Sequence, residues 1–176
     1  NASIKYNSFK NEKNDSVLSE AINNLSSEKN FYGTLTTLEN IKIKINNNNI
    51  ESAYNDYIIL LKDKNLEPLY KSAIAIHGSY SLLGLVGKNG NLKNLNYEFL
   101  NNIKSKIQEL ISYVDKSIES YDGFRLEIQY LLTIFDENLD KSNVSDESKK
   151  LYIQIQENDK ISPSLKDRVK KIHEFQ

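Results

Sequence analysis

The chain has 176 residues without cysteine, methionine or tryptophan, and its 23 basic and 24 acidic side chains give a formal net charge of −1. The lack of cysteine excludes disulfide bonds and thiol chemistry, and the balanced charge provides no long-range field to attract nucleic acid. Only six glycines and two prolines interrupt the chain, so long helices are expected. The composition therefore predicts an all-α helical bundle that has no nucleic acid partner.

The first residues are expected to lie outside this fold. The chain starts with Asn1, Ala2 and Ser3 instead of methionine, which is typical of a tag remnant joined to a segment of a longer precursor. The usual reason to remove a natural N-terminus is that it carries a signal peptide or a lipid anchor. We expect residues 1–13 to be a tag remnant and flexible tether, and residues 14–176 to form a single α-helical domain.

Helical periodicity dominates the segment that follows. Apolar side chains recur at spacings of three and four, which predicts amphipathic helices. These helices cover residues 17–25, 31–45 and 50–64, and the second of them is either a separate helix or a continuation of the first. Residues 41–45 also alternate like a strand, but their helical surroundings favour helix. The asparagines 46–49 are poor helix formers, so a turn is predicted there, with Asn49 capping the next helix.

A central helix is predicted after residue 65. Residues 72–87 carry no charged side chain, which is typical of a helix buried on most sides. Asn65 is expected to cap this helix, with Pro68 in its first turn, and the helix is expected to fray after Gly84. His77 is expected to be a hydrogen-bonded core or boundary histidine. The predicted inward face consists of Leu69, Tyr70, Ala73, Ile74, His77 and Tyr80.

The next segment leaves two interpretations open. From Leu100 to Phe135 the apolar positions keep one three-four phase, with Ser117 as a polar exception, and the phase is maintained through Asp122 and Gly123. One interpretation is a single long helix over 96–139 that bends at Gly123. The other is a helical hairpin that breaks at Gly123. The sequence favours neither.

Two short helices are predicted at the end of the chain. Ser145 follows a polar connection and is expected to cap the first of them, and Ser162 with Pro163 is expected to start the second. The basic cluster over 166–171 is expected on the solvated side of the last helix, and His173 is expected in solvent.

The sequence contains no arrangement typical of catalysis or metal binding. His77 and His173 lack the spacings of metal-ligand motifs. The carboxylates that avoid the apolar stripe are expected to be solvated; they are Glu98, Glu109, Asp115 and Glu119. The sequence thus predicts no catalytic, cofactor-binding or metal-binding residue, no cofactor and no enzymatic activity.

Polar loops are the expected site of recognition, because their polar groups are not consumed by the core. The two loops concerned cover 87–96 and 140–145. Tyr6, Tyr97 and Tyr113 are expected to be partly exposed, and exposed tyrosine is a favoured binding anchor. The candidate partner-binding residues are Lys88, Asn89, Asn91, Lys93, Asn94, Lys141 and Asn143.

The Lys/Asn/Ile-rich composition, the Asn-Lys-rich start over 6–13 and the helical pattern over 100–139 resemble the mature part of the helical outer-surface lipoproteins of spirochaetes of the Borrelia type. The resemblance implies an extracellular, surface-exposed protein, lipid-anchored in its precursor to the outer membrane, with no other membrane contact. It also implies a non-enzymatic adhesin or immune-evasion role, in which a host protein such as a complement regulator or a matrix component is bound.

Two other interpretations stay open at this point. The chain is alternatively the extracytoplasmic ligand-sensing domain of a membrane receptor, in which the glycine-containing central helix flanks a small-ligand cavity. The third interpretation is an intracellular helical scaffold.

Overall fold

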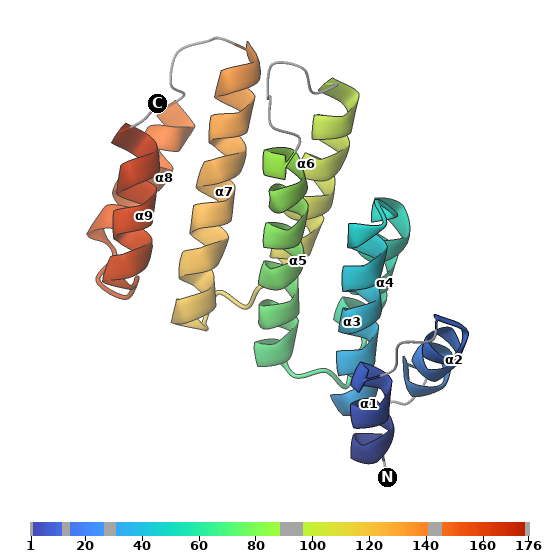
Figure 1. Cartoon of the computed structure of the whole chain (residues 1–176). Helices are drawn as coiled ribbons and strands as arrows, with labels where there is room; N and C mark the ends of the chain where they lie inside the picture. Colours follow the sequence, from blue (N-terminus) through green and yellow to red (C-terminus); the bar gives the residue numbers. More distant parts are fainter. Residues whose placement is uncertain (1, 12–14, 27–30, 89–96, 141–145, 175–176) are drawn as a thin grey trace. The chain divides into compact units, whose positions relative to one another are not determined.

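The computed structural model describes residues 2–11, 15–26, 31–88, 97–140 and 146–174. Within these ranges all regular secondary structure is helical, so the predicted all-α class is confirmed (Figure 1). None of the described helices is both long and apolar enough to cross a bilayer. The chain divides into two compact units, Asn1–Asp63 and Lys64–Gln176, where the sequence had predicted one domain over 14–176.

The described residues of unit 1 form four helices, α1 (Ala2–Asn11), α2 (Asp15–Ser26), α3 (Phe31–Asn46) and α4 (Ile50–Lys62). The helix α1 packs against α2 and α3, and α3 packs against α4. The predicted tether is wrong for residues 2–11, because they form α1. The physical reason is Tyr6, which is 9% exposed and packs beside Tyr32 with a ring-centroid distance of 5.9 Å. Burial of an aromatic side chain stabilises a segment that would otherwise remain unfolded.

The asparagine turn between α3 and α4 is confirmed. Asn48 has φ of 59°, a left-handed conformation that asparagine tolerates better than most residues. Its N–H donates to Ile45 O at 3.0 Å and the Asn49 N–H donates to Lys44 O at 2.8 Å, which together form a Schellman motif at the end of α3. Asn49 is the N-cap of α4, but its side chain makes no capping hydrogen bond. Its ψ of 65° lies outside the extended region from which an N-cap side chain reaches the first amides.

In the part of unit 2 that the structure describes there are five helices, α5 (Pro68–Lys88), α6 (Tyr97–Ser112), α7 (Glu119–Asp140), α8 (Asp146–Glu157) and α9 (Pro163–Glu174). The helix α7 packs against α5, α6, α8 and α9, and it is therefore the central helix of this unit. Figure 1 shows α5, α7 and α9 side by side and running in the same direction, with α6 and α8 antiparallel to them in a second layer. Unit 2 is thus an open, two-layered bundle.

The segment over 97–139 is a helical hairpin, so the interpretation as one long helix is wrong, and so is the predicted position of the break at Gly123. The break lies at residues 113–118, between α6 and α7, and Gly123 lies inside α7. Asp115 makes this turn, because its carboxylate accepts hydrogen bonds from the Ser117 N–H at 2.9 Å and the Ser117 hydroxyl at 2.7 Å. The hydroxyl of Ser72 also accepts the Asp115 N–H at 2.9 Å, which fixes the turn against α5. Such local side-chain bonds compete with helix continuation.

The helix α5 begins at Pro68, so the prediction that this proline lies in the first turn is confirmed. Asn65 is not its cap, since the Glu67 carbonyl accepts the first helical N–H, that of Lys71, at 3.0 Å. A residue that precedes proline is driven out of the helical region, so the helix cannot start earlier than Pro68. The expected fraying after Gly84 is also wrong, because α5 continues to Lys88.

The inward face of α5 differs from the predicted one. Leu69, Tyr70 and His77 are exposed, whereas Ser72 and Ser79 are completely buried. Each serine hydroxyl donates to a carbonyl one turn earlier in its own helix, that of Pro68 or Ala75, at 2.9 and 2.8 Å. A buried hydroxyl with this partner carries no unsatisfied donor into the core. Serine therefore occupies buried positions that were not part of the predicted inward face.

The C-terminal helices surround one apolar core. The start of α9 at Pro163 is confirmed, and the Ser162 carbonyl accepts the N–H groups of Leu165 and Lys166. Gly123 of α7 faces this core, where an added Cβ would lie 3.4 Å from Ile161. The expected cap Ser145 lies outside the described residues. The buried cluster consists of Leu126, Tyr130, Ile134, Ile155, Ile161, Leu165 and Val169.

Candidate functional site

Three ionisable side chains converge between α5, α7 and α9. Glu127 of α7 is 1% exposed, and its two carboxylate oxygens accept hydrogen bonds from Nε and Nη2 of Arg168, both at 2.5 Å. The hydroxyl of Tyr80 on α5 donates to the same carboxylate. We call these three residues the Glu127 cluster. It joins the three parallel helices of one layer, and sequence reasoning missed it because Glu127 was not separated from the solvated carboxylates.

The three ionisable side chains of the Glu127 cluster bind one another, so both carboxylate oxygens of Glu127 are occupied. Burial, and then the hydrogen bond to Glu127, raise the pKa of Tyr80 above its usual range, so its proton is held on oxygen. The hydrogen bond to Glu127 raises the pKa of Arg168. A bidentate arginine and a tyrosine occupy both carboxylate oxygens, which a general base would need for accepting a proton. This arrangement favours a role in holding helices together.

A second polar group lies between α7, α8 and α9. The hydroxyl of Tyr130 and Nδ1 of His173 are 2.9 Å apart, and the imidazole stacks on Tyr152 with a ring-centroid distance of 4.1 Å. The prediction that His173 lies in solvent is therefore wrong, since the residue is half-buried and packs on the core. His77 shows the opposite error, because it is exposed rather than a core or boundary residue.

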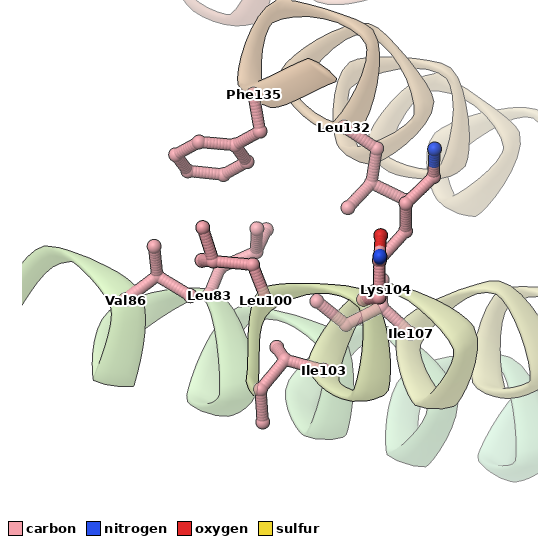
Figure 2. Close-up of a pocket in the computed structure, with 9 residues that line it drawn as sticks. Leu83, Val86, Leu100, Ile103, Lys104, Ile107, Leu132 and Phe135 are labelled. Carbon is pink, nitrogen blue, oxygen red and sulfur yellow. The ribbon is translucent and has the colours of Figure 1, made fainter. Parts of the chain in front are cut away.

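An apolar cavity lies between α5, α6 and α7. Its volume is 20 Å³, and Figure 2 shows Leu132 and Phe135 of α7 facing Val86 and Leu100 across it. A volume of about 10–15 Å³ is needed for one water molecule, so the cavity has space for about one molecule of that size. Lys104 and Asn101 contribute the polar atoms at its edge.

The predicted recognition loops fall largely outside the described residues. Lys88 ends α5, and no structural statement is made for Asn89, Asn91, Lys93, Asn94, Lys141 and Asn143, which lie outside those residues. The helix ends that flank both loops, at Lys88 and Tyr97 and at Asp140 and Asp146, lie at the same end of unit 2 (Figure 1). The apolar cavity lies toward this end as well, because it is lined by the last half of α5 and the first half of α6.

Several predicted surface residues have defined roles. Asp115 makes the turn after α6, and its hydrogen bonds from Ser117 lower the pKa of the carboxyl. Glu119 pairs with Lys160 at 2.6 Å, which raises the pKa of the lysine. Tyr113 is half-buried, whereas Tyr6 is buried. The prediction that Tyr6 is a partly exposed binding anchor is therefore wrong. Among the described residues no group of three or more histidine, aspartate or glutamate side chains is placed to hold a metal ion.

No protein-family model, curated protein or solved structure matches the chain. The resemblance to the spirochaetal lipoproteins therefore stays a prediction. The function is argued below from the arrangement of the described residues.

Proposed function

We propose that the protein is a non-enzymatic binding protein that recognises another protein through the surface of unit 2. The observation that carries this proposal is that Arg168 and Tyr80 occupy both oxygens of the buried Glu127 carboxylate. The ionisable groups that converge in this part of the chain are thereby engaged with one another. The layered helices meanwhile present helix faces and loop-bearing helix ends to solvent, as helical arrays that bind proteins do.

The finer form of the proposal follows the resemblance to spirochaetal outer-surface lipoproteins. In that form the protein is lipid-anchored in its precursor, is displayed on the cell surface, and binds a host protein such as a complement regulator or a matrix component. The loops over 87–96 and 140–145 are the contact surface in this proposal. The helix ends that flank these loops lie at one end of unit 2, and the proposal places the partner at this end.

The experiment compares capture by the full chain with capture by two loop variants. In each variant one segment, 89–96 or 141–145, is replaced by glycine and serine at unchanged length. The matched control is the double variant Lys149→Ser/Lys150→Ser, which removes two exposed charges from α8. Surface plasmon resonance against purified complement regulators and matrix proteins, together with a pull-down from host serum, measures binding.

We expect at least one loop variant to lose binding by about tenfold or more while the α8 control binds as the unchanged chain does. Unchanged capture by both loop variants removes the loops from the proposal. Absence of binding by the unchanged chain to every host protein removes the finer form.

The alternative of a ligand-sensing domain is not favoured by the cavity. Small-molecule sites have volumes of roughly 300–1,000 Å³. The apolar cavity between α5, α6 and α7 has a volume of 20 Å³, which accommodates about one water molecule.

A further inference from the structure

We draw no further inference here: the strongest candidate, the apolar cavity of 20 Å³ between α5, α6 and α7, is lined by the parts of α5 and α6 next to residues 89–96, which lie outside the described residues, so nothing in the structure shows what covers it.

Discussion

Removal of Arg168 should leave Glu127 buried without its cationic partner, and the variant Arg168→Met tests this consequence. The carboxylate is 1% exposed and binds the guanidinium through two hydrogen bonds at 2.5 Å. Two unit charges about 4 Å apart attract each other by about 4 kcal/mol at an effective dielectric constant of about 20. Since Arg168 is half exposed, water replaces part of this interaction, and we expect a loss of about 2–3 kcal/mol in the free energy of unfolding.

Urea unfolding followed by far-ultraviolet circular dichroism measures this loss. Because the chain has two compact units, amide hydrogen exchange of peptides from α7 and α9 assigns the loss to unit 2. The matched control is Lys170→Met, which removes an exposed charge from the same helix and breaks only a 3.9 Å contact with Glu174. The control should stay within about 0.5 kcal/mol of the unchanged chain.

A variant in which apolar side chains replace all three members of the Glu127 cluster provides a second comparison. The triple variant Glu127→Leu/Arg168→Met/Tyr80→Phe removes the buried charge together with its partners. It should recover to within about 1 kcal/mol of the unchanged chain, because a well-packed apolar set often equals a buried ion pair. If Arg168→Met matches Lys170→Met, or if the three substitutions destabilise additively, Glu127 does not depend on Arg168 and the argument fails.

Four further predictions concern the other structural features. Burial and the hydrogen bond to Glu127 raise the pKa of Tyr80, so the folded state keeps a proton that the unfolded chain loses near pH 10. The free energy of unfolding should therefore fall as the pH rises above about 10. Urea titrations at several pH values should show a smaller fall for Tyr80→Phe. His173→Ala should cost about 1–2 kcal/mol by thermal unfolding, because it removes the contact with Tyr130 and the aromatic stack; a cost below about 0.3 kcal/mol contradicts this packing. Asn48→Val should cost about 1–2 kcal/mol in unit 1, since a β-branched residue is strained at φ of 59°, and Asn48→Gly should be neutral or slightly stabilising. Gly123→Ala should be neutral or stabilising by up to about 1 kcal/mol, because its Cβ makes ordinary contact at 3.4 Å, and a clear destabilisation by circular dichroism speaks against this packing.

The helix pattern of the sequence predicted most of the fold, and its failures have a common cause. The three-four phase continues from α6 into α7, so it carried no sign of the turn. That turn depends on the carboxylate of Asp115 and its bonds to Ser117, which are local polar contacts. Ser117 was the polar exception in the apolar stripe, and together with the aspartate two residues earlier it was the signal for a turn.

The prediction of which residues of α5 face inward was wrong for a related reason. The helix is apolar nearly all round, so periodicity does not define which face is buried. Ser72 and Ser79 were not among the residues predicted to face inward, yet their hydroxyls bond to the helix itself and both residues are buried. Hydropathy describes the transfer of a free hydroxyl, and it does not account for a hydroxyl that keeps its partner inside the core.

The Glu127 cluster was beyond prediction from sequence, because its members come from three helices. Tyr80, Glu127 and Arg168 are separated in the chain by 47 and 41 residues. No local pattern joins such positions, and a lone glutamate on a helix is usually solvated. The candidate loops were predictable as polar connections from turn-forming residues alone, but their partner was not.

Photo-crosslinking from Asp146→Cys, at the exposed first residue of α8 beside the loop over 140–145, tests the central claim most directly, because the chain has no other cysteine that would compete for the label. The control is Ile153→Cys on α8, where the unchanged residue is 50% exposed. Each thiol is labelled with benzophenone, irradiated in the presence of host serum proteins, and examined by mass spectrometry. Recognition through the loop end of unit 2 predicts crosslinks to a host protein from position 146 and not from position 153. Equal crosslinking from both positions, or crosslinking from position 153 alone, contradicts the account.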